Sequence, residues 1–179
     1  CIRDSYSPLV HSLGKVFGSS RYLDYMESFR YSLSGEFAFI RSLGRGIGIS
    51  PTWGLEVSTL SEVYKNTSNR RICQTEIMES YEHKHQELGS QDSGNGISKM
   101  AKDIAKTLFR VMAQEGVIFS AASCKTLQAT YYQESRFEIS KYSALSKVND
   151  LKYDREKEIT AVMAFEEAIK GCLLYTSPS

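Results

Sequence analysis

Hydrophobic residues recur at helical spacing through the second half of the chain. Between residues 97 and 112 an apolar side chain returns every three or four positions, which is typical of an amphipathic helix that buries one face. Ser98 can cap the start of this helix, and Gly116 can end it. The apolar positions of this face are Ile97, Met100, Ala101, Ile104, Ala105, Leu108, Phe109 and Met112.

Two further helices are predicted after this one. The first begins near Ser120 and continues to about Leu145. The second begins at Asp154, where nearby glutamates suit the positive end of the helix dipole, and stops at Gly171. From residue 97 to Gly171 the pattern therefore predicts helices joined by short loops.

The first 95 residues have a mixed pattern. An aromatic-rich stretch, 5–28, predicts two short helices that are broken around Gly18. Residues 36–41 and 70–78 are rich in residues that favour strands, so each is expected to form a short strand. Between them, 55–64 places its apolar residues on one helical face.

This pattern predicts an α/β fold class with a helical appendage. The polar loop 89–96 divides the chain into a mixed region, 1–95, and a helical region, 96–171. The glycine-rich run at 44–48 lacks the context of a nucleotide-binding loop and is read as a flexible connector. Residues 172–179 change character abruptly and are interpreted as a non-native tail, with a genuine C-terminal extension as the alternative.

Composition narrows the class of protein. The 179 residues carry 22 Lys and Arg against 21 Asp and Glu, and 41% are hydrophobic, as in ordinary globular chains. A net charge of +1 disfavours a nucleic-acid partner, and no apolar run is long enough to span a membrane. The cysteines are far apart and are expected to be free, mostly buried thiols in a reducing cytoplasmic compartment: Cys1, Cys73, Cys124 and Cys172.

Three short clusters in the mixed region could carry chemistry. Residues 33–36 (Leu-Ser-Gly-Glu) form a turn in which glycine lets the backbone approach a ligand, although, taken alone, they are better explained as a turn before a strand. Trp53 stands three residues before Glu56, and an aromatic ring beside a carboxylate suits a sugar. The alternative is a core tryptophan with a glutamate that only favours the helix start.

The third cluster is His83-Lys84-His85. In an extended segment both imidazoles point the same way, as metal ligands could, and a lysine between them suits phosphate. Two histidines do not complete a metal site, so further ligands would have to come from elsewhere. A solvent-exposed segment without a role is the alternative.

These clusters, taken in order, resemble the glucosyl-3-phosphoglycerate synthases, which are retaining glycosyltransferases of the nucleotide-diphospho-sugar (GT-A) type. The family has a Leu-Ser-Gly-Glu-aromatic-Ala segment, then an aromatic-Gly-Val-Glu-Ile segment, then a histidine in a basic loop. Here the matching stretches are 33–38, 53–57 and 83–86. The similarity covers about residues 8–90 and is weaker in the helical region.

The resemblance implies a role for each matching residue. His83 would bind the divalent metal, Mg²⁺ or Mn²⁺, that holds the donor diphosphate. His85 stands where the family usually has the Asn that contacts the phosphoglycerate acceptor, and Lys84 would help bind that acceptor. The positions that match the sugar-donor pocket are Leu33, Ser34, Gly35, Trp53 and Glu56.

The resemblance further implies transfer of glucose from a nucleotide-diphosphate sugar to 3-phosphoglycerate, on the route to a compatible solute. The family's Asp-x-Asp motif and uridine-binding half have no counterpart here, so the chain is expected to be an inactive C-terminal portion that holds the acceptor side. The alternatives are another GT-A transferase, such as a mannosyltransferase, and a non-catalytic helical interaction module. A homodimer through the C-terminal helices is compatible with this pattern.

Overall fold

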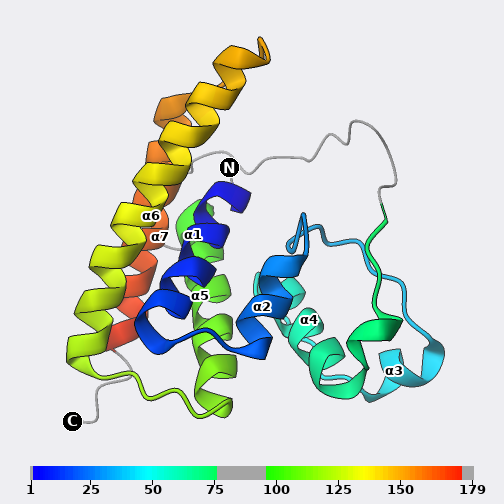
Figure 1. The fold of residues 1–179 in the computed structure, drawn as a ribbon. Helices are drawn as coiled ribbons and strands as arrows, with labels where there is room; N and C mark the ends of the chain where they lie inside the picture. The colour runs from blue at the N-terminus through cyan, green and yellow to red at the C-terminus, as the bar shows by residue number, and fades with distance from the viewer. Residues whose placement is uncertain (1, 76–95, 175–179) are drawn as a thin grey trace.

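The computed structural model describes residues 2–75 and 96–174, and within these ranges every regular element is a helix (Figure 1). None of these helices is long and apolar enough to cross a bilayer. In chain order the elements are α1 (Ile2–Phe17), α2 (Arg21–Ser28), α3 (Arg41–Gly46), α4 (Leu55–Asn66), the 3₁₀ helix η1 (Asn69–Arg71), α5 (Ile97–Gln114), α6 (Ala121–Val148) and α7 (Arg155–Leu174).

Four of the longer helices form a bundle. Helix α6 packs against α1 and α7, and α7 also packs against α5 (Figure 1). The side chains between them are removed from solvent, as the apolar periodicity requires. Because α1 precedes residue 95 and the other three helices follow it, both regions of the chain contribute to one hydrophobic core. The division into two domains at residue 95 stays a prediction.

Two shorter helices attach a looser part of the chain to this bundle. Helix α2 contacts α1 and α4, and α4 contacts α5. The buried Tyr22 hydroxyl lies 2.7 Å from Ser61 Oγ, which joins α2 to α4. Burial raises the pKa of Tyr22 above its usual value, because the phenolate would lose its hydration.

Serine and glycine residues in the sequence predicted several helix ends correctly. Ser20 caps α2 by accepting a hydrogen bond from the Leu23 N–H, after a break at Gly18, where φ is +89°. Ser120 begins α6 in a capping box with Ser123. Gly116 follows the end of α5 with φ +93°, as predicted.

Two other helix ends differ from the prediction. Helix α5 is capped by Gly96 rather than Ser98, and no side-chain cap hydrogen bond is present there. Helix α7 continues through Gly171 to Leu174, so the predicted stop is wrong. A glycine inside a helix costs about 1 kcal/mol relative to alanine. Tertiary packing of the turn before it, where Ala168 and Ile169 are fully buried, can offset such a cost.

The predicted α/β fold class is wrong for the described residues, which contain no strand. Residues 36–40 have no regular structure and lead into α3. Where the second strand was expected, from residue 70 onward, the chain forms the end of η1 and then an irregular segment, 72–75. Residues 76–78 lie outside the described part. The residues of 36–41 favour strands only when a partner strand accepts their hydrogen bonds, and the described residues provide no such partner. The predicted connector at 44–48 likewise begins inside α3.

Candidate functional site

The structure brings together two clusters that the sequence separates. Gly35 adopts φ +74°, a left-handed conformation that favours glycine. A Cβ atom built on Gly35 would lie 3.6 Å from Oε1 of Glu56, so Gly35 lies beside a carboxylate that the first turn of α4 carries. Glycine permits the turn, and it places no side chain beside the carboxylate.

The other members of the turn hold its shape. Leu33 packs, partly buried, against the hydrophobic core. Ser34 Oγ accepts a hydrogen bond of 3.4 Å from the Glu36 N–H, which closes the turn locally. These contacts support the backbone of the turn. Ser34 and Glu36 line a hollow in the protein surface.

Trp53 and Glu56 flank the start of α4. The Trp53 side chain is 41% exposed, which excludes the interpretation of this residue as a core tryptophan. Glu56 is in the first turn of the helix, where unpaired backbone N–H groups favour a negative charge. An exposed indole and a carboxylate three residues apart are therefore both accessible from the same end of α4.

Gly54, between these two residues, is buried against α5. A Cβ on Gly54 would overlap the Thr107 hydroxyl and would lie 2.8 Å from Thr107 Cβ. The sequence analysis missed Thr107. One signal could have found it, because Thr107 is a polar residue on the otherwise apolar face that contains Ile104 and Leu108.

Beside α4 the surface is hollowed on two sides. One hollow has a volume of ≈ 500 Å³ and reaches Ser34 and Glu36, and the other has a volume of ≈ 750 Å³. Tyr25 lines both, and its buried hydroxyl has no hydrogen-bond partner among the described residues. Burial raises the pKa of Tyr25 to about 12. The residues common to both hollows are Tyr25, Phe29, Thr67, Ile72 and Cys73.

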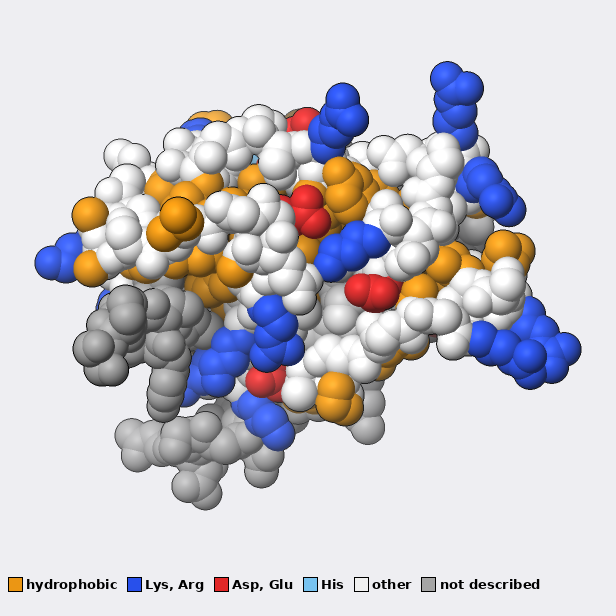
Figure 2. Space-filling view, turned by 90° about the horizontal axis from the view of Figure 1, so that it is seen from below, with side chains coloured by type: hydrophobic (Ala, Val, Ile, Leu, Met, Phe, Trp, Pro, Cys, Tyr) orange, Lys and Arg blue, Asp and Glu red, His pale blue; other side chains and the backbone are white. Residues whose placement is uncertain are grey.

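Basic side chains lie on the same part of the molecule. Arg41 and Arg45 of α3 are exposed, as are Arg70 and Arg71 of η1, and Arg71 lines the smaller hollow. In the view of Figure 2, Lys and Arg side chains gather at the right-hand end, on the side where α3 lies in Figure 1. A positive surface of this kind attracts anionic ligands over a distance of roughly one Debye length, about 10 Å.

The third predicted cluster, His83-Lys84-His85, lies outside the described residues. Among the residues that the structure does describe, no group of three or more His, Cys, Asp or Glu side chains could hold a metal ion. The assignment of His83 to a divalent metal, and of Lys84 and His85 to the acceptor, therefore stays a prediction.

The structure describes the side chains of two of the four cysteines, Cys73 and Cys124, and both are free, as predicted. Cys124 is buried, and burial raises the pKa of its thiol. Cys73 is exposed, which differs from the expectation that the thiols are mostly buried.

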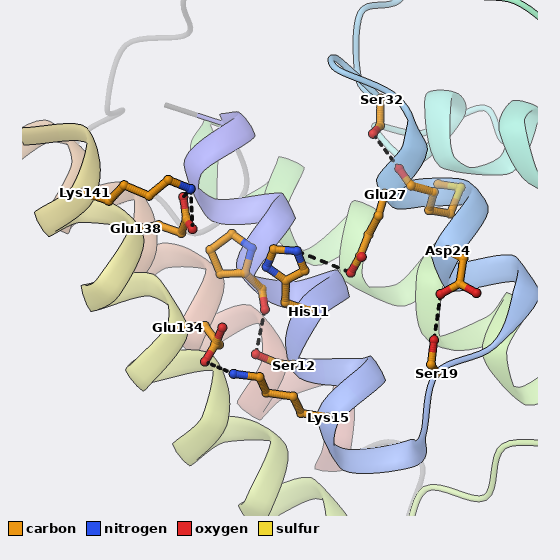
Figure 3. A network of polar contacts seen from close by, with 12 residues as sticks. His11, Ser12, Lys15, Ser19, Asp24, Glu27, Ser32, Glu134, Glu138 and Lys141 are labelled. Carbon is orange, nitrogen blue, oxygen red and sulfur yellow. Dashed lines mark hydrogen bonds and ion pairs between the residues drawn. The ribbon is translucent and has the colours of Figure 1, made fainter. Parts of the chain in front are cut away.

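A polar network elsewhere connects the bundle (Figure 3). His11 of α1 lies 3.5 Å from Glu27 of α2, and Lys15 of α1 donates a 2.6 Å hydrogen bond to Glu134 of α6. Both pairs join helices and neither involves the residues at the start of α4. We therefore attribute this network to packing within the bundle and to the attachment of α2 to α1.

Comparison with known proteins decides what the chain resembles. It is 60% identical over 165 residues to a glucosyl-3-phosphoglycerate synthase of Persephonella marina, a match that covers 92% of the chain and 41% of that relative. The resemblance to the glucosyl-3-phosphoglycerate synthases is confirmed. A protein of the same name from Methanococcoides burtonii is 38% identical over 149 residues, which is 83% of the chain and 36% of the relative.

The matches cover most of this chain but less than half of each relative. The chain spans about two fifths of the length of these curated synthases. Since 165 of its 179 residues are matched, the similarity to the Persephonella synthase extends well beyond residues 8–90 into the helical region. No family model matches the chain, and no solved structure was found to match it.

Proposed function

We propose that this chain takes part in the transfer of glucose from a nucleotide-diphosphate sugar to 3-phosphoglycerate. One observation carries the proposal: the turn at Gly35 lies against the Glu56 carboxylate. Both positions match the sugar-donor site of the synthases, yet they stand 21 residues apart in the sequence. Their contact is what a shared binding site requires.

The described residues would bind and orient the sugar. The Glu56 carboxylate can accept hydrogen bonds from sugar hydroxyls, and charge-assisted bonds of this type are short and directional. The exposed face of Trp53 can cover the apolar face of a hexose, and Gly35 places no side chain beside the carboxylate. Holding the donor in one orientation reduces the entropic cost of reaching the transition state.

The remaining parts of the reaction rest on residues that the structure does not describe. A divalent cation, when bound, would neutralise charge on the leaving diphosphate. Among the described residues, no group of three His, Cys, Asp or Glu side chains could hold that cation. We propose retention of configuration, with Glu56 as a binding residue rather than a nucleophile, and acceptor binding at Lys84 and His85.

The test uses the protein at the full length of its curated relatives. Glu56→Gln keeps the shape of the side chain and removes its charge, so it should raise the KM for the nucleotide sugar at least tenfold, a loss of about 1.4 kcal/mol. Glu62→Gln, which changes a glutamate six residues further along the same helix, is the matched control. A Glu56→Gln protein with the kinetics of Glu62→Gln would refute the assignment. Comparing glucose with mannose donors decides between glucosyl and mannosyl transfer.

A second candidate function is supported by the bundle itself. On α6, Phe137 is 65% exposed and Val148 is 82% exposed, and Leu151, just beyond the helix, is 65% exposed. Exposed apolar side chains favour an interaction surface, so a non-catalytic helical module, including a homodimer through these helices, is the alternative. Sedimentation analysis of the wild type and of Phe137→Glu measures this directly. A wild type that is monomeric at all concentrations would argue against the homodimer.

A further inference from the structure

Gly54 is the point at which a long loosely packed stretch meets the core. After Met26 no residue is buried until Gly54, although several side chains of the stretch are partly covered. The carbonyl oxygen of Gly54 then accepts a 2.9 Å hydrogen bond from the Ser58 N–H, which closes the first turn of α4. The position of Gly54 therefore sets where α4 begins.

The part of α5 against which Gly54 packs is held in a fixed conformation. Thr107 is 7% exposed, and its hydroxyl donates a 2.8 Å hydrogen bond to the carbonyl oxygen of Asp103, one turn earlier in α5. A β-branched side chain that is held in this way has little rotamer freedom. The Asp103 carbonyl oxygen would itself lie 3.0 Å from a Cβ on Gly54. Any side chain at position 54 would therefore push α4 away from α5.

Such a displacement would reach the candidate sugar site directly. Trp53 immediately precedes Gly54, and Glu56 follows it by two residues. Glu56 Oε1 also lies close to Gly35, on a turn with no buried residue of its own. Moving the start of α4 would thus change the distance between the carboxylate and the turn. Misplacement of a binding group by about 1 Å can reduce a rate by roughly 10²-fold.

We propose that Thr107, through its contact with Gly54, is a positioning residue for Glu56 and Trp53. Helix α5 then sets the geometry of the sugar-donor site, although it contributes no side chain that touches the sugar. This inference rests on the proposed function, because it takes Glu56 as the residue that binds the donor.

The experiment compares variants of the full-length protein in donor and acceptor kinetics and in thermal unfolding. Gly54→Ala should raise the KM for the nucleotide sugar at least tenfold and leave the KM for 3-phosphoglycerate within twofold. Gly48→Ala is the matched control, because a Cβ at position 48 would meet no atom within 4 Å. Adding Thr107→Ala to Gly54→Ala should lower the donor KM again, since it removes the hydroxyl that the new methyl group overlaps. The rescue should be partial, because the Cβ of residue 107 remains 2.8 Å away.

Single variants at position 107 keep the proposal testable if Gly54→Ala does not fold. Thr107→Ala should raise the donor KM severalfold, whereas Thr107→Ser, which keeps the hydroxyl, should stay within twofold of the wild type. A purely structural role would lower the melting temperature and leave the donor KM unchanged, which would overturn the proposal. A folded Gly54→Ala protein with the same donor KM as Gly48→Ala would also overturn the proposal.

Glu56→Gln separates the sugar-binding role of Glu56 from the positioning role of Thr107. If it leaves the donor KM unchanged, the proposed sugar site is wrong, and the positioning role fails with it. If Glu56→Gln raises the donor KM while Gly54→Ala and Thr107→Ala do not, the sugar site stands and only the positioning role is refuted.

Discussion

The bundle and the stretch 27–53 are stabilised in opposite ways. In the bundle, long helices meet through fully buried side chains such as Leu13, Leu127 and Phe165. In the stretch 27–53 no residue is buried, and its shape depends on a few local features, above all the left-handed Gly35. The comparison shows a stable scaffold that carries a loosely packed segment, and candidate binding residues lie in that segment or where it joins α4.

The largest expected effect comes from a cavity in the bundle. Leu127→Ala removes a side chain with no exposed surface and should reduce the free energy of unfolding by about 2–5 kcal/mol. Chemical denaturation followed by far-UV circular dichroism measures the loss. Val148→Ala, at a position 82% exposed, is the control and should change stability by less than about 0.5 kcal/mol. Equal losses would mean that α6 is not packed as described.

Glycine substitutions should have opposite signs in the two regions. Gly35→Ala places a side chain at φ +74° and should destabilise the protein by roughly 1–2 kcal/mol. Gly14→Ala, inside α1 where a Cβ would meet no atom within 4 Å, should stabilise it by up to about 1 kcal/mol. Thermal unfolding of both variants tests the contrast. A stabilised Gly35→Ala protein would show that the turn is not left-handed.

Alkaline pH should weaken the contact between α2 and α4. Burial raises the pKa of Tyr25 to about 12, so between about pH 10 and pH 12 the unfolded chain loses this proton while the folded chain keeps it. The contribution of Tyr25 to stability is therefore constant below about pH 10 and is lost as the pH rises toward 12. Tyr25→Phe should make the decline shallower. A Tyr25→Phe protein whose stability falls as steeply as that of the wild type would contradict the assignment.

The smallest effect is expected from the ion pairs that join the bundle helices. Lys15 and Glu134 are 2.6 Å apart, but the lysine side chain is 61% exposed and solvent screens the attraction. Lys15→Ala should lower the free energy of unfolding by no more than about 1 kcal/mol, and 1 M NaCl should reduce the difference between variant and wild type. A difference that salt leaves unchanged would point to lost packing of the lysine stem instead.

The sequence alone was sufficient for most of the helices and for the resemblance. The helices at 55–64 and 97–112 appear as Leu55–Asn66 and Ile97–Gln114, because a 3.6-residue apolar period is a local property of the chain. Three short motifs in order, at 33–38, 53–57 and 83–86, were sufficient to indicate a resemblance to the glucosyl-3-phosphoglycerate synthases, which the 60% identity confirms.

Tertiary structure alone decided the fold class and the geometry of the candidate site. Residues 36–41 favour a strand in isolation, but a strand needs hydrogen-bond partners from elsewhere, and no local pattern reveals whether they exist. The contacts of Gly35 with Glu56 and of Gly54 with Thr107 likewise join residues 21 and 53 positions apart. Such contacts depend on how the helices pack together, which the order of residues along one helix does not contain.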